Sequence, residues 1–126
     1  MNFSFAINAD LPHKILCIKV TGFCAAVEDF LKYEQAFLKT WQAHFGNAKI
    51  KLLIDQRDYQ PTTREVTEHV IRHRQQVKGK VLASAVVVGV GVGHLQMQRI
   101  VREADTAGGE KLFTDYDEAL QWLKKQ

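Results

Sequence analysis

Cysteine and proline are scarce in this chain, with two residues of each type among 126. Cys17 lies inside an apolar strand pattern and Cys24 follows a turn, so their positions do not predict a disulfide framework, and we expect free thiols in a reducing compartment. The first residues lack a basic start followed by a long apolar core, which argues against a signal peptide. No window is apolar over the length needed to span a bilayer. We therefore expect a cytoplasmic protein without a transmembrane segment.

A strong excess of one charge is also lacking. The chain has 17 Lys and Arg against 14 Asp and Glu, and this net charge of +3 permits an anionic partner without requiring one. Acidic residues dilute the basic ones and most aromatic residues fall at core spacing, so we expect a solvated surface and no nucleic-acid partner. The basic residues around the second expected helix are Arg57, Arg64, Arg72, Arg74, Lys78 and Lys80.

Apolar spacing predicts five strands and four helices in a single domain. The expected strands cover residues 2–8, 14–21, 49–55, 81–88 and 110–114. A helix follows each of the last four strands, at residues 25–45, at 62–78, in the segment up to Gly108, and from Asp115 onward. The first two strands are close enough for a hairpin, and helical crossovers make the other pairings parallel. We therefore expect an α/β fold with a mixed sheet and the order β-β-α-β-α-β-α-β-α.

The expected helices differ in how much apolar surface they carry. The first has a broad apolar face on which only Glu34 is polar. The second has a thin apolar stripe and is expected at the edge of the core. That stripe consists of Val66, Val70 and Val77. Capping-box patterns begin the second and last helices, at Thr62 with Glu65 and at Asp115 with Glu118.

Glycines follow the fourth expected strand at positions 89, 91 and 93, where phosphate-binding loops occur between a strand and a helix. The dinucleotide pattern G-x-G-x-x-G fails, because the third glycine position holds His94 when counted from Gly89. The phosphate-loop pattern with Gly-Lys-Ser/Thr is absent as well. We interpret the segment as a structural turn, and a looser anion or ligand contact at His94 stays open.

Other polar groups offer weaker candidates for chemistry. Glu65, His69 and His73 repeat every four residues, a spacing that can chelate a metal, but no third ligand is evident and a solvated helix shoulder is favoured. Asp55 and Asp58 lie at the end of the third strand and could do acid–base work or hold a metal, although caps for backbone groups are the simpler interpretation. No Ser, Cys or Thr stands on a G-x-S-x-G elbow. We expect no catalytic activity and no cofactor.

Three segments resemble those of small bacterial STAS/SEC14-type proteins: LLIDQRDYQPTTREV at 52–66, HLQMQRIVREA at 94–104 and LFTDYDEALQWL at 112–123. The expected strand order is similar to the STAS or SpoIIAA-like fold, a mixed sheet with helices after the second to fifth strands. The resemblance covers nearly the whole chain. Its motifs are patterns of packing, so it implies the fold more strongly than a function.

Two functions are implied by this resemblance. Anti-sigma-factor antagonists of the STAS class bind a kinase partner and are switched by phosphorylation of a serine in an Asp-Ser-Ser-Gly-like loop. The corresponding loop here, residues 56–63, offers Asp58 and the hydroxyls of Thr62 and Thr63 but no such serine. Other SpoIIAA-like proteins resemble lipid-binding modules that hold apolar ligands under a mobile helix. The last helix, after Gly108 and Gly109, is the candidate to move in this chain.

The sequence therefore predicts a non-catalytic regulatory domain that binds a protein partner of unknown identity. The alternative is a carrier of a small apolar or anionic ligand, which would need an apolar cavity with a few polar groups, whereas a protein binder needs an exposed apolar patch. Leftover apolar residues such as Ile71 and Leu95 would suit a homodimer contact. The expected binding residues are Asp55, Arg57, Asp58, Tyr59, Thr62 and Thr63, facing Gly91, Gly93 and His94.

Overall fold

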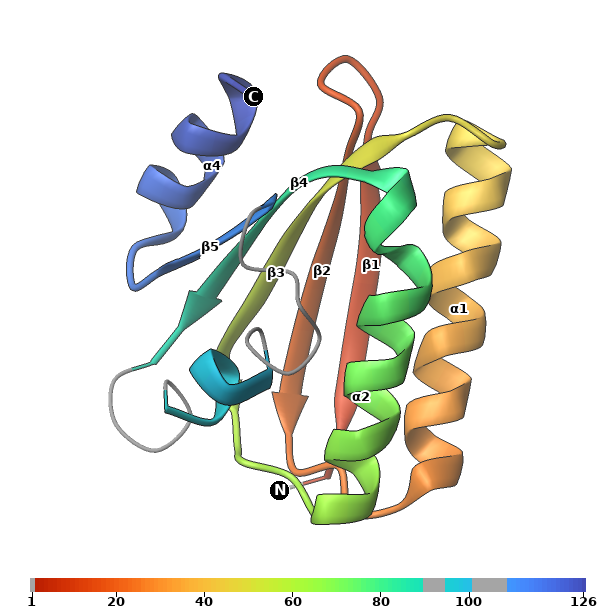
Figure 1. Ribbon diagram of the computed structural model, residues 1–126, viewed down its shortest axis with the longest axis vertical. Helices are drawn as coiled ribbons and strands as arrows, with labels where there is room; N and C mark the ends of the chain where they lie inside the picture. The colour runs from red at the N-terminus through yellow and green to blue at the C-terminus, as the bar shows by residue number, and fades with distance from the viewer. Residues whose placement is uncertain (1, 90–94, 101–108) are drawn as a thin grey trace.

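A five-stranded mixed sheet forms the centre of the computed structural model, which describes residues 2–89, 95–100 and 109–126 (Figure 1). The strands lie in the order β1-β2-β3-β4-β5. The first pair is antiparallel and the other three pairs are parallel. This arrangement confirms the expected α/β fold. The bounds are β1 Ser4–Asp10, β2 Ile15–Gly22, β3 Ile50–Tyr59, β4 Val81–Val88 and β5 Glu110–Phe113.

Helices cover the two faces of the sheet unequally. The helices α1 (Val27–Phe45) and α2 (Arg64–Val77) lie side by side over one face, and α4 (Tyr116–Lys124) packs on the other face against β3, β4 and β5 (Figure 1). A short 3-10 helix, Lys78–Lys80, follows α2. Of the third expected helix, the structure describes residues 95–100, which are helical. Within the described ranges, no helix is long and apolar enough to cross a membrane.

Strand alternation divides the apolar side chains between two cores. In β2, Leu16, Ile18 and Val20 join the core beneath α1 and α2, while Ile15 faces α4. Leu53 of β3 also belongs to the α4 side, and its neighbours along the strand, Leu52 and Ile54, face α1 and α2. Both faces of β3 are therefore buried, as is typical of a central parallel strand.

The face of α1 that packs on the sheet is rotated from the expected one. Its buried residues are Phe30, Tyr33, Phe37 and Trp41. Leu31 and Leu38, which fit the expected apolar face, are 40% and 49% exposed. The aromatic rings decide the orientation, because they bury more area than leucine. The rings of Tyr33 and Phe37 lie 6.2 Å apart between centroids, and those of Phe37 and Trp41 lie 5.7 Å apart.

Two local predictions were wrong at the junction of β3 and α2. The strand was expected to end at Asp55, but it continues to Tyr59, because its last residues pair with the end of β2 beyond a register shift at Lys19. Thr63, rather than Thr62, is the N-cap of α2, and its side chain accepts a hydrogen bond of 3.3 Å from the amide of Val66. The expected cap at Asp115 is confirmed for α4, since its carboxylate accepts from the amide of Glu118.

Gly22, at the end of β2, requires glycine for two reasons. Its φ of +83° lies in the left-handed region, and a Cβ atom would overlap the carbonyl group of Asn2. The same segment fixes the end of β3, because the amide of Gln60 donates a hydrogen bond of 2.8 Å to the carbonyl of Gly22.

Replacing Gly22 with alanine is expected to lower the free energy of unfolding by about 1–3 kcal/mol, through backbone strain and the overlap with Asn2. Gly79→Ala is the matched control, because a Cβ there would meet no atom within 4 Å and its φ is not left-handed. We expect that control to stay within about 0.5 kcal/mol of the parent. Urea denaturation followed by circular dichroism measures both, and equal stabilities of the two variants would contradict the prediction.

Candidate functional site

A cavity of about 570 Å³ lies between α2, the sheet face beneath α1 and α2, and residues 95–100. This volume is in the range of small-molecule sites, which are roughly 300–1,000 Å³ and mostly apolar. Apolar side chains from β2, β3, β4, α1 and α2 form most of the wall. They include Val20, Phe30, Phe37, Leu52, Ile54, Val70, Val77, Val88, Met97 and Ile100.

One end of the cavity is closed by amide hydrogen bonds. Thr62 precedes α2, and its backbone N–H donates to Oε1 of Gln96 at 3.3 Å. Nε2 of Gln96 in turn donates to the carbonyl of Thr62 at 3.4 Å. The hydroxyl of Thr62 points elsewhere and donates to the carbonyl of Cys24. The start of α2 is thus tied to residues 95–100 by two long hydrogen bonds.

A buried ion pair lies toward the other end of the cavity. Nη2 of Arg74, on α2, contacts Oε2 of Glu110, on β5, and the two side chains are 9% and 4% exposed. Burial lowers the pKa of Arg74 to about 10, which still leaves the guanidinium charged near neutral pH. Ser84 of β4 lies beside Glu110 in the sheet and also lines the cavity. Buried charges of this kind require hydrogen-bond partners to offset their lost hydration.

Three polar atoms of this cluster find no hydrogen-bond partner among the described residues. They are Nε of Arg74, Oγ of Ser84 and Oε1 of Glu110. The cluster was not predicted from the sequence, because Arg74 was expected on a solvated basic face and no role was expected for Ser84 or Glu110. One signal was available: Arg74 lies four residues after Val70, beside the apolar stripe of α2.

His73 joins the two helices above the sheet. Its Nδ1 donates to Oε2 of Glu34 at 2.9 Å, and its ring lies 4.8 Å from the ring of Phe37 between centroids. Burial lowers the pKa of His73 below its ordinary value of 6.5, while the carboxylate of Glu34 opposes that shift. The predicted solvated shoulder is therefore wrong at this position. Among the described residues, no group of three His, Cys, Asp or Glu side chains is placed to hold a metal ion.

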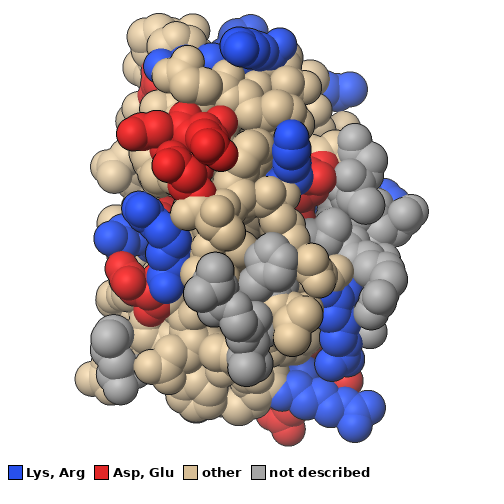
Figure 2. Space-filling view, turned by 90° about the vertical axis from the view of Figure 1, so that its left-hand side faces the viewer, with Lys and Arg blue, Asp and Glu red and all other residues tan. Residues whose placement is uncertain are grey.

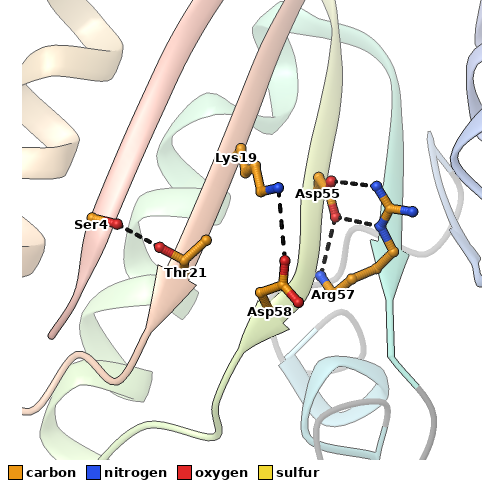
Figure 3. A network of polar contacts seen from close by, with 6 residues as sticks. All are labelled: Ser4, Lys19, Thr21, Asp55, Arg57 and Asp58. Carbon is orange, nitrogen blue, oxygen red and sulfur yellow. Dashed lines mark hydrogen bonds and ion pairs between the residues drawn. The ribbon is translucent and has the colours of Figure 1, made fainter. Parts of the chain in front are cut away.

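The residues predicted as one binding surface separate onto two faces. Asp55 and Arg57 lie on the α4 face, where Asp55 is 6% exposed in its side chain and accepts from Nε of Arg57 at 3.0 Å and Nη2 at 2.8 Å (Figure 3). The guanidinium of Arg57 also lies 5.5 Å from the ring centroid of Tyr116. Burial raises the pKa of Asp55, but its hydrogen bonds with Arg57 outweigh burial and lower the pKa below the ordinary value.

Asp58 is the most accessible of the predicted binding residues that the structure describes. Its carboxylate lies 3.7 Å from Nζ of Lys19, and the two side chains are 63% and 52% exposed (Figure 3). An ion pair this exposed is weak, because water screens it. Tyr59 and Thr62 instead line the cavity on the opposite face. The remaining predicted residues, Gly91, Gly93 and His94, lie outside the described residues.

Charges of both signs share the face that carries α4 and β5. Figure 2 shows small groups of basic and acidic side chains there, some in contact with each other and others divided by uncharged residues. The cation of Lys111 makes a local cation–π contact, with its Nζ 5.3 Å from the ring centroid of Phe113. Because charges of opposite sign are interspersed on this surface, their fields largely cancel at long range and would attract a polyanion only weakly.

The profile of the SpoIIAA-like family matches residues 15–124. A protein from Shewanella loihica PV-4 with a SpoIIAA-like fold is 18% identical, with a TM-score of 0.73 over 98% of this chain and 96% of that chain. An anti-sigma factor antagonist from Mycobacterium paratuberculosis is 14% identical, with a TM-score of 0.66 over 98% and 95%. No curated protein matches the chain significantly.

The free energy of unfolding is expected to fall as the pH drops through about 6.5, because the unfolded chain binds a proton at His73 that the folded chain resists. His73→Gln keeps a donor for Glu34 without titrating. Denaturation curves of both proteins from neutral to mildly acidic pH isolate this contribution, since the other histidines are common to both. Parallel pH profiles for the two proteins would show that His73 does not contribute.

Proposed function

The chain belongs to the SpoIIAA-like family, and we propose that it binds a small apolar molecule in the cavity beneath α2. The single observation that carries this proposal is a mostly apolar space of about 570 Å³ whose wall also holds polar groups. Binding in such a space is driven by removal of apolar surface from water. The proposed activity is carriage or sensing of the ligand, without chemical change.

The packing of α2 supports this function. The helix packs more closely against α1 than against any strand, and only Val66 of its apolar stripe is fully buried. Val70 and Val77 are half-buried and line the cavity. A bound ligand would cover these two valines, so that the thin stripe acquires an apolar partner.

Filling the cavity is expected to weaken binding of N-phenylnaphthylamine, an uncharged apolar fluorophore. Val70→Trp places an indole in the cavity and should weaken binding about tenfold or more. Arg72→Trp is the matched control, because residue 72 is exposed two positions away on the same helix. Fluorescence titration measures both variants, and circular dichroism checks that each is folded. Equal affinities for the two variants, or no binding to the parent protein, would refute a cavity site.

A second function is binding of a protein partner at the exposed surface around Asp58. It is favoured by the similarity in fold to an anti-sigma factor antagonist. The surface offers Lys19, Arg57 and Asp58, whose side chains are 52%, 44% and 63% exposed. Of these three residues Arg57 also lines the cavity and Lys19 and Asp58 do not, so a substitution at Asp58 tests this surface separately from the cavity.

Reversing the charge of Asp58 is expected to reduce recovery of such a partner about tenfold, by removing an attraction and adding a repulsion. Glu68→Lys is the matched control, because it also breaks one exposed ion pair, with Arg64. Quantitative crosslinking in an extract of the host compares the parent, Asp58→Lys and Glu68→Lys. Recovery that is the same for both variants would count against this surface.

A further inference from the structure

The chemistry of the ligand's polar end follows from the buried cluster of Arg74, Ser84 and Glu110. Each of these residues lines the cavity. The side chains of Arg74 and Glu110 are 9% and 4% exposed, and Ser84 is a buried residue. Their unpartnered atoms are a donor, an acceptor and a hydroxyl that can act as either. Leaving such groups unpaired away from water is costly, so the site is incomplete without a polar occupant.

Charge balance limits what that occupant can be. The guanidinium of Arg74 is already compensated by Oε2 of Glu110, so the pair carries no net charge. A carboxylate or phosphate entering beside it would place a second anion near the free Oε1 of Glu110. An ammonium group would meet the guanidinium at equally close range. Both ions would lose their hydration in an apolar cavity, where the described cations of the lining, Arg57, Arg74 and Lys78, already have partners of their own.

An uncharged group with both a donor and an acceptor has neither problem. It can accept from the Nε–H of Arg74 and donate to Oε1 of Glu110, and the hydroxyl of Ser84 can pair with it in either sense. Alcohols and carboxamides have this combination. We propose, on the basis of the cavity site proposed above, that the ligand is an uncharged apolar molecule ending in a hydroxyl or amide group, which the cluster of Arg74, Ser84 and Glu110 binds.

The apolar part of the ligand would extend from this cluster along α2. Val70 and Val77 form the wall on the helix side, and Ile54 and Val88 form it on the sheet side. The far end, where Thr62 and Gln96 bond to each other, has its amide groups already paired. Among the described residues, the unpaired polar atoms therefore lie at the β5 end, which orients an amphipathic ligand with its head there.

Competition against bound N-phenylnaphthylamine tests this specificity with four ligands of one chain length: decanol, decanamide, decanoate and decylammonium. All are used near neutral pH and below the concentrations at which they form micelles. We expect decanol and decanamide to displace the probe at concentrations on the order of tenfold lower than either ion. Equal potency of all four would overturn the assignment of the head group while leaving the cavity site intact.

Removing the counter-charge provides the decisive variant. In Glu110→Gln the guanidinium of Arg74 loses its partner, so we expect the preference to shift by about tenfold or more toward decanoate and away from decylammonium. Ser84→Ala, which keeps the ion pair, should weaken decanol and decanamide severalfold and leave the order of the ligands unchanged. It serves as the test if Glu110→Gln does not fold.

The outcomes separate this inference from the function on which it rests. In one outcome the probe binds the parent protein and Val70→Trp blocks that binding, but the selectivity among the four ligands is the same in Glu110→Gln and in Ser84→Ala as in the parent. This would mean that water alone occupies the polar cluster, and it would overturn the head-group assignment. Failure of the probe to bind the parent protein would overturn both. A shift toward decanoate in Glu110→Gln, or the selective loss in Ser84→Ala, would support the assignment.

Discussion

The thin apolar stripe of α2 is the constraint on which the arrangement of this molecule depends. A helix with so little apolar surface cannot be held on a sheet by burial alone. Here two polar pairs hold it: His73 with Glu34 on α1, and Arg74 with Glu110 on β5. These pairs are formed by polar side chains that reach across to α1 and β5, and not by apolar side chains packed directly between α2 and the sheet. They therefore fix the helix while leaving space between it and the sheet. The cavity is a result of that balance.

The fold was predictable because its signals are local and repeated. The buried run Ile50–Ile54 and the alternation of β1 could each be recognised within one segment. Segment boundaries were less predictable. The extension of β3 through Tyr59 depends on pairing with Gly22, which is distant in sequence and displaced by a register shift. No pattern within residues 56–61 reveals that partner.

The site was less predictable than the fold for a related reason. Arg74 and Glu110 are 36 residues apart, and each alone is typical of a solvated surface. Their burial follows from which way α2 faces, and that direction is set by His73 and the aromatic residues of α1. Asp55, by contrast, lies inside β3 rather than at its end, and the register shift that follows it places Asp55 and Tyr59 on opposite faces of the sheet.

The buried ion pair also bears on how this protein responds to temperature. The hydration of charged groups becomes less favourable as temperature rises, because ordering water around an ion has a strongly negative entropy. The free-energy cost of removing Arg74 and Glu110 from water on folding therefore decreases on warming, while hydrophobic stabilisation per unit area levels off. The contact between α2 and β5 is thus of a kind that gains relative strength with heat, unlike the apolar contacts around it.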